Sequence, residues 1–230
     1  MDYSNHLLLQ IRLLLGKKLG LLRPIVRFVR RIRHANYEEQ FDFALLKSVS
    51  ASDTVWDVGA NKGYYTEQLA RLVPSGAIVA FEPSPETFNY LNDTFGSMPN
   101  VHLENVALSD QDGEVSFFIS NNSHEDSLFN KADGLRPCVL VRAAKADSFL
   151  HLFPPDVVKI DVEGFELEVM RGMSEVLLSS RLKCIFIEVH FSILADRGQK
   201  DAPKEIVALL KDAGMSVKWL DPSHLVATRT

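Results

Sequence analysis

Short apolar runs alternate with amphipathic stretches along most of this chain. The runs are largely hydrophobic throughout, which is typical of strands that are buried on both faces of a sheet. The stretches between them carry apolar residues at helical spacing, as in residues 84–95, where Ser84 and Pro85 are suited to begin a helix. This pattern predicts an α/β fold with a mainly parallel sheet and helices on both faces. The apolar runs lie at residues 54–57, 77–82, 101–106, 157–161 and 183–190.

The remaining segments complete this outline. Residues 110–143 interrupt the alternation and are expected to form an inserted β-hairpin with a polar loop at residues 121–134, a loop suited to contribute to a binding site. Further helices are predicted at residues 38–49, 64–73, 165–178 and 203–213, and a closing hairpin at residues 215–229.

Residues 1–34 carry eight Lys or Arg residues and a single acid. The apolar run at residues 7–15 contains Arg12, is too short to span a bilayer and lacks the flanking features of a signal peptide. After Pro24, the apolar and Arg residues fall on different sides of a helix. We therefore treat residues 1–37 as a basic amphipathic helical arm. It could contact an anionic membrane, pack on the body or on a second copy to form a homodimer, or serve as a mitochondrial presequence.

Residues 38–230 are expected to form one α/β domain of ordinary size, since the chain has 230 residues, of which 46% are hydrophobic. This body is acidic, because the whole chain has a formal net charge of −5 despite the basic arm. An acidic body binds polyanions poorly, so no nucleic-acid partner is expected. Cys138 and Cys184 lie in apolar runs and indicate buried thiols of a reducing compartment. We expect a cytoplasmic protein, with any membrane contact peripheral and at the inner face.

The sequence DVGANKGYYT, residues 57–66, follows directly after an apolar run. Gly59 and Gly63 allow a tight turn and a close approach of the backbone to a ligand, and the next helix points unpaired N–H groups to the same place. Glu82 ends the next strand, where a carboxylate can accept hydrogen bonds from both hydroxyls of a ribose. These features predict a nucleoside site. The polar residues that end the predicted strands, and should converge, are Asp57, Glu82, Asn105, Asp161, Glu188 and His190.

The glycine loop differs from two common nucleotide motifs. Neither the dinucleotide fingerprint G-x-G-x-x-G nor the P-loop G-x-x-x-x-G-K-[ST] occurs in the chain. Asp57 would repel a pyrophosphate, but it could hold an ammonium group directly or through water. S-adenosylmethionine (SAM) carries such an ammonium group, whereas NAD does not. The loop therefore favours SAM as the cofactor.

The chain contains a series of longer motifs that occur in a fixed order. They are DVGANKGYYT, FEPSPETFNYL, NVALSDQDGEVSFF, VVKIDVEGFELEVMRGM and, last, IFIEVH. In this combination, over about residues 40–220, the chain closely resembles the FkbM family of SAM-dependent methyltransferases. The resemblance implies a class I, Rossmann-like methyltransferase fold with a seven-stranded sheet, and transfer of a methyl group to oxygen. Hydroxyls of sugars and of polyketides are among the acceptors of such families.

The resemblance also assigns cofactor contacts by position. It implies that Glu82 binds the ribose and that Asn105 and Ala107 lie near the adenine. Around the methionine part of the cofactor it implies Asp57, Gly59, Asn61, Gly63 and Thr66.

The candidate catalytic residues follow two later strands. Asp161 is expected nearest the transferred methyl group, with Glu163 beside it. Methyl transfer requires alignment of the acceptor hydroxyl and removal of its proton. Asp161, Glu188 and His190 are candidates for the proton acceptor, and the ordinary pKa of histidine suits this role. These three side chains could also ligate a divalent cation, but they come from two strands and form no compact metal motif, so no metal site is predicted.

These observations predict a SAM-dependent O-methyltransferase that acts on a hydroxyl, with a sugar of a glycan or glycolipid as the favoured acceptor. Two alternatives stay open. The acceptor could be a small natural product, or the chain could be a non-catalytic protein that uses a cofactor site for binding or assembly. The titratable groups beyond the glycine loop argue against the non-catalytic alternative, because a binding module does not need them.

Overall fold

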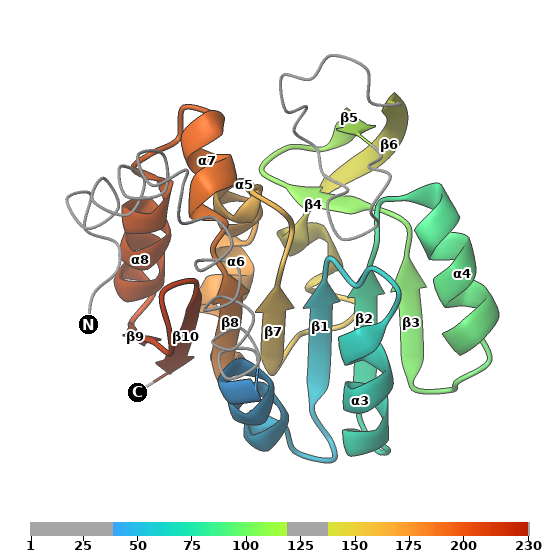
Figure 1. Ribbon diagram of the computed structural model, residues 1–230. Coiled ribbons are helices and arrows are strands. Elements are labelled where there is room, and N and C mark those ends of the chain that lie inside the picture. Colours follow the sequence, from blue (N-terminus) through green and yellow to red (C-terminus); the bar gives the residue numbers. More distant parts are fainter. Residues whose placement is uncertain (1–38, 119–137, 230) are drawn as a thin grey trace, which may run out of the picture.

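The computed structural model of the protein describes residues 39–118 and 138–229. A seven-stranded sheet forms its centre, in the order β3-β2-β1-β7-β8-β10-β9 (Figure 1). Pairing is parallel from β3 to β8, and β10 runs antiparallel to both of its neighbours. The predicted seven-stranded, mainly parallel sheet is confirmed. Its strands are β1 (Thr54–Val58), β2 (Ala77–Phe81), β3 (Val101–Glu104), β7 (Val157–Ile160), β8 (Cys184–Glu188), β9 (Met215–Trp219) and β10 (His224–Arg229).

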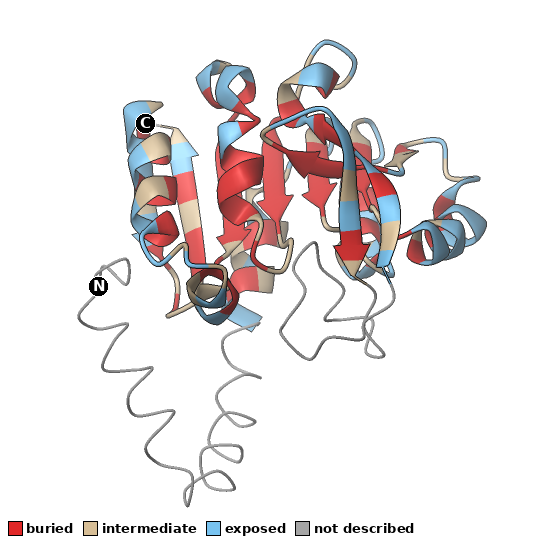
Figure 2. Ribbon diagram, turned by 90° about the horizontal axis from the view of Figure 1, so that it is seen from above, coloured by how far each residue is buried: buried red, intermediate tan, exposed pale blue. Residues whose placement is uncertain are grey.

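Helices cover both faces of the sheet, as predicted. Phe41, in a helix over residues 39–48, belongs to one buried cluster with side chains of α3 and α4, such as Leu91. A second cluster holds side chains of α5, α6 and α8, such as Val169 and Leu210. Seen from above, the central strands β1, β2, β7 and β8 are buried and the outer surfaces of the helices are exposed (Figure 2). The helices are α3 (Tyr64–Leu72), α4 (Pro85–Phe95), α5 (Glu166–Arg171), α6 (Ser174–Leu178), α7 (Phe191–Asp196) and α8 (Ala202–Asp212).

The starts of α3 and α4 follow from local chemistry. Ser84 Oγ accepts a hydrogen bond from the Thr87 N–H at 3.4 Å, and Pro85 takes the first position of α4, as predicted. Gly63 precedes α3 with a φ of 82°, in the left-handed region that favours glycine. Each helix follows a strand of the parallel sheet, so both helices begin near the carboxyl ends of the strands.

A second sheet, in the order β4-β6-β5, lies above the carboxyl ends of the large sheet in Figure 1. Strands β5 (Gly113–Phe118) and β6 (Cys138–Lys145) are antiparallel, which confirms the predicted inserted hairpin. Strand β4 (Ala107–Ser109) was not predicted and pairs in parallel with β6, because the chain leaves the large sheet after Glu104 and crosses to the small one. The polar loop predicted at residues 121–134 lies outside the described residues.

Two helical predictions need correction. The helix predicted at residues 165–178 is divided into α5 and α6. The division falls at Gly172, where the backbone approaches β4 so closely that a Cβ atom would lie 1.8 Å from the carbonyl oxygen of Ser109. Helix α7 was not predicted, because its six residues are too few to show a helical repeat.

The predicted arm at residues 1–37 lies outside the described residues, so its contact with a membrane or with a second copy stays a prediction. The helices of the described residues do not include a candidate for a membrane span, which would need both greater length and higher hydropathy. Cys184 is buried, as expected, whereas Cys138 is exposed because it begins β6 at one end of the small sheet.

Candidate functional site

A cavity of about 530 Å³ lies at the carboxyl ends of β1, β2, β7 and β8, with β4 and β5 forming one of its walls. Ligands bind at this end of open α/β sheets. The predicted site residues that line the cavity are Gly59, Asn61, Glu82, Ala107, Asp161, Glu163, Glu188 and His190. The predicted site residues outside this lining are Asp57, Gly63, Thr66 and Asn105.

The glycine loop is held tightly against the sheet. The N–H groups of Gly59 and Ala60 both donate to the carbonyl oxygen of Phe81 at 3.0 Å, which ties the loop to the end of β2. Gly59 has a φ of 77°, and a Cβ atom on it would lie 1.9 Å from the carbonyl oxygen of Asp161. A side chain at this position would therefore separate the loop from the chain that follows β7.

Asp57 supports the loop from below instead of facing the cavity. Its side chain is fully buried, with Oδ2 accepting a hydrogen bond from Thr66 Oγ1 at 2.8 Å and Oδ1 lying 3.1 Å from the Nζ atom of Lys159. Gly63 also has a supporting position, since a Cβ atom on it would lie 2.3 Å from the ring of Phe95 in α4.

Lys159 is a site residue that the sequence analysis did not single out. Its side chain is 2% exposed, and Nζ donates to the carbonyl oxygen of Gly59 at 3.2 Å and lies 3.7 Å from Asp161. Burial alone would lower the pKa of Lys159, but the carboxylates of Asp57 and Asp161 raise it above its ordinary value. The sequence did contain a signal for this residue, because a lysine inside the apolar run VVKID must be buried and a buried charge needs partners of opposite charge.

The carboxylate of Glu82, which follows β2, contacts the glycine loop on the side away from Lys159 and β7. Oε2 accepts from the N–H of Asn61 and Oε1 from the N–H of Ser84, each at 2.8 Å. Asn105 holds the backbone here, because its Nδ2 donates to the carbonyl oxygens of Glu82 and Pro83 at 2.8 and 3.2 Å. Each carboxylate oxygen has a second lone pair, so Glu82 can accept further hydrogen bonds from a ligand.

An apolar wall adjoins Glu82. It consists of Val106, which directly precedes β4, Leu108 in β4 and Phe117 in β5. A flat aromatic ring can pack against such a wall while polar groups attached to it reach the carboxylate. The apolar side chains and the accepting carboxylate at this end of the cavity therefore fit a ligand that joins an aromatic ring to hydroxyl groups, as the adenosine part of SAM does.

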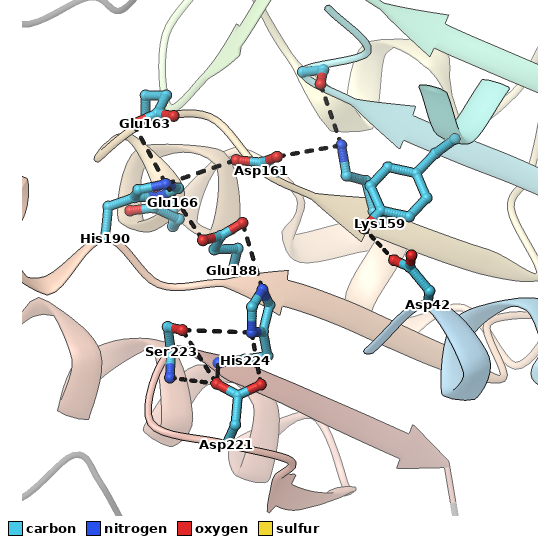
Figure 3. Close-up of polar contacts among 12 residues, drawn as sticks. Asp42, Lys159, Asp161, Glu163, Glu166, Glu188, His190, Asp221, Ser223 and His224 are labelled. Atoms are coloured by element: carbon cyan, nitrogen blue, oxygen red, sulfur yellow. Dashed lines mark hydrogen bonds and ion pairs between the residues drawn. The ribbon is translucent and has the colours of Figure 1, made fainter. Parts of the chain in front are cut away.

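A polar cluster surrounds His190 (Figure 3). Its residues follow β7 and β8, whereas Glu82 follows β2 on the other side of β1, so the cluster and Glu82 lie at opposite ends of the cavity. Nε2 of His190 lies 3.8 Å from Asp161, 3.4 Å from Glu163 and 3.8 Å from Glu188. The Nδ1 atom of His190 lies 2.7 Å from Oε1 of the buried Glu166, which also accepts from the Gly164 N–H at 2.9 Å. All four residues predicted to be catalytic are thus brought together around one imidazole.

The environment sets the protonation of this cluster. Burial alone would lower the pKa of His190, but the hydrogen bond with Glu166 and the charges of Asp161 and Glu163 raise it to about 10. Burial raises the pKa of Glu163 to about 7, although His190 acts in the opposite direction. Burial also raises the pKa of Asp161, against the influence of Lys159. At neutral pH, His190 therefore carries a proton already and cannot accept another.

Asp161, Glu163 and His190 have a spacing that could hold a metal ion, since one ligand atom from each lies within 4.8 Å of the others. Sequence spacing did not reveal this group, because Asp161 and Glu163 follow β7 whereas His190 follows β8. A hydrogen-bonded carboxylate such as Glu166 is common behind a metal-binding histidine, but it equally stabilises an imidazolium.

Residues 57–217 match the family model described as Methyltransferase FkbM domain. The hexuronic acid methyltransferase AglP of Haloferax volcanii is 29% identical over 202 residues, which cover 84% of this chain and 76% of that protein. The 2-O-methyltransferase NoeI of Sinorhizobium fredii is 23% identical over 185 residues, which cover 72% of this chain and 76% of that protein.

A solved structure has a similar fold. The crystal structure of a methyltransferase FkbM from Methylobacillus flagellatus matches with a TM-score of 0.54 and 14% sequence identity. The match covers 78% of this chain but 44% of that one. Together with the sheet order, this similarity confirms the expected class I methyltransferase fold.

We predict that Lys159→Met lowers the free energy of unfolding by about 3–5 kcal/mol, because it leaves the carboxylate of Asp57 buried without its cation. Adding Asp57→Asn to this variant should recover most of the loss. Urea denaturation of the two variants and of the exposed control Lys218→Ala measures the effect. Equal stability of Lys159→Met and the wild-type protein would show that the pair does not hold the site together.

Proposed function

Because the chain belongs to the Methyltransferase FkbM domain family, we propose that it is a SAM-dependent O-methyltransferase that acts on a saccharide hydroxyl in a glycan or glycolipid. The observation that carries the proposal is that one cavity contains two different polar groups. Glu82, a carboxylate placed to bind a ribose, lies at one end, and a cluster of proton-accepting groups lies at the other. The relatives named for hexuronic acid and for 2-O methylation support a sugar acceptor.

The residues at the Glu82 end would hold the cofactor. Glu82 accepts the ribose hydroxyls, the backbone of Gly59 and Asn61 lies beside the methionine part, and Ala107 lies beside the adenine. Four further residues do not line the cavity but fix the backbone of these segments from behind. They are Asp57, Gly63, Thr66 and Asn105. When bound, SAM supplies an electrophilic methyl group on a good leaving group.

The residues at the other end align the acceptor and remove its proton. Glu163 is the best placed proton acceptor, because its carboxylate has a pKa of about 7 and lines the cavity. Asp161 and Glu188 lie on the same wall and can accept hydrogen bonds from neighbouring hydroxyls. The proton-acceptor role expected of His190 does not fit its raised pKa, so in this proposal His190 acts as an imidazolium that orients the carboxylates.

The proposed reaction needs no divalent cation. The imidazolium of His190 already lies among Asp161, Glu163 and Glu188, where a metal ion would otherwise balance their charges. Nor does the proposal include a nucleic-acid partner, because the body of the chain is acidic.

The proposal is tested by binding and transfer together. We expect S-adenosylhomocysteine to bind in calorimetry, and isotope-labelled SAM to transfer its methyl group to members of a panel of methyl hexosides and methyl hexuronides. Glu82→Gln should weaken binding at least tenfold, since it removes charge-assisted hydrogen bonds. Binding without transfer to any sugar or lipid acceptor would favour a non-catalytic protein, and transfer to a polyketide alone would favour the natural-product alternative.

Glu163 as the proton acceptor gives a defined pH dependence. The carboxylate must be ionised, so kcat/KM should rise with pH up to about pH 7 and then stay level until the pH approaches about 9. Glu163→Gln should lower kcat by about 100-fold or more, with unchanged S-adenosylhomocysteine binding. The exposed Glu175→Gln provides the matched control. A wild-type pH profile in Glu163→Gln would assign the proton to another group.

Metal independence can be tested on the same assay. Treatment with EDTA should leave the transfer rate unchanged, and added Mg²⁺ or Mn²⁺ should not raise it, because His190 supplies the positive charge in the cluster. Loss of activity in EDTA that Mg²⁺ or Mn²⁺ restores would instead assign Asp161, Glu163 and His190 to a metal site.

A further inference from the structure

The turn between β9 and β10 brings a second histidine to the cavity. His224 is the first residue of β10 and lies opposite Glu188 in the pairing of β10 with β8. Its side chain is 7% exposed and lines the cavity together with Glu188. No sequence motif pointed to it, because 35 residues lie between the two positions.

Both ring nitrogens of His224 face a carboxylate (Figure 3). Nδ1 lies 2.7 Å from Oδ2 of Asp221, and Nε2 lies 3.4 Å from Oε2 of Glu188. The other oxygen of Asp221 accepts from the N–H groups of Ser223 and His224, at 2.8 and 3.0 Å. The ring also packs on Phe41, with their centroids 4.5 Å apart. The imidazole therefore cannot turn without losing contacts on several sides.

These contacts determine the charge of each partner. Burial alone would lower the pKa of His224, but Asp221 and Glu188 raise it to about 9. At neutral pH the ring thus has two N–H groups, one for each carboxylate. Burial alone would raise the pKa of Glu188, but His224 and His190 more than offset this and lower it. Glu188 therefore stays ionised and can only accept hydrogen bonds.

We propose that Asp221 and His224 are positioning residues, which hold Glu188 as a hydrogen-bond acceptor for a hydroxyl of the sugar. This inference rests on the proposed function, since it concerns the acceptor half of the same cavity. His224 Nε2 holds Oε2 of Glu188 in an ion pair at 3.4 Å, whereas Oε1 lies 3.8 Å from Nε2 of His190. Oε1 can therefore accept from a ligand hydroxyl while Oε2 remains fixed.

The arrangement has a specific consequence at alkaline pH. When His224 loses a proton, the remaining proton stays on Nδ1 beside Asp221. Nε2 then has a lone pair facing Glu188, so the ion pair between His224 and Glu188 is lost. The KM for the acceptor should then rise as the pH passes about 9. The other charged or titratable groups that interact with Glu188 are Lys159 in β7, Asp161 and Glu163 in the turn after β7, Tyr65 in α3 and His190 at the start of α7.

The first test uses His224→Phe, which keeps an aromatic ring on Phe41 and removes both nitrogens. With the methyl glycoside that the wild-type chain methylates best, the KM should rise about tenfold at neutral pH. The dissociation constant of S-adenosylhomocysteine should be unchanged in calorimetry, because Glu82 is untouched. Lys218→Ala, an exposed change in the same hairpin, should match the wild-type protein in both measurements.

The second test uses Asp221→Asn and carries the proposal if His224→Phe fails to fold, as judged by thermal melting. The amide keeps an oxygen for the turn and donates its N–H to Nδ1 of His224, which leaves the ring proton on Nε2 facing Glu188. The rise of KM above pH 9 should disappear in this variant. A purely structural role of Asp221 would not change the pH profile.

The outcomes separate the two proposals. A wild-type chain that transfers no methyl group to any glycoside rejects the proposed function, and the role of His224 with it. Wild-type transfer combined with an unchanged KM in His224→Phe, or with an alkaline rise that persists in Asp221→Asn, rejects the role of His224 alone. If His224→Phe weakened S-adenosylhomocysteine binding as much as it raised the KM for the acceptor, the whole cavity would be disturbed. That result would also overturn the positioning role of His224.

Discussion

The buried ammonium group of Lys159 joins the parts of the site that come from separate strands. It lies within 3.2 Å of both Asp57 and the carbonyl oxygen of Gly59, and it also faces Asp161. Asp57 and Lys159 are almost inaccessible to water, so the buried charge of Asp57 depends on the ammonium group of Lys159. Because the pair links β1 to β7, it fixes the glycine loop relative to the polar cluster, and the proposed positions of cofactor and acceptor depend on it.

The two ends of the cavity use carboxylates in different ways. Glu82 is held by backbone N–H groups and is directed at the loop, as suits a group that binds and does not react. Glu163 and Glu188 lie near imidazoles that are themselves anchored by buried carboxylates, Glu166 for one and Asp221 for the other. The pKa values of the carboxylates at this end are shifted by burial and by neighbouring charges. Such shifts are typical of groups that transfer protons.

Much of this arrangement could be predicted from the sequence, because strands of a parallel sheet end at one edge and polar residues at those ends must converge. Glu82 and the cluster around His190 are examples. The protonation of His190 was not predictable, since it depends on Glu166, which the sequence analysis did not connect with His190. His224 was missed because only the antiparallel pairing of β10 with β8 places it beside Glu188. Similarly, the break at Gly172 reflects contact with β4, which no local pattern encodes.

Binding of the nucleoside at Glu82 and of the reactive hydroxyl at Glu163 is the central claim. A crystal structure of the full chain with S-adenosylhomocysteine and an accepted methyl glycoside tests it most directly. We predict that both ribose hydroxyls donate to Glu82 and that the methylated hydroxyl of the sugar lies within hydrogen-bond distance of Glu163. A nucleoside bound away from Glu82, or a reactive hydroxyl remote from the carboxylates of the cluster, would contradict it.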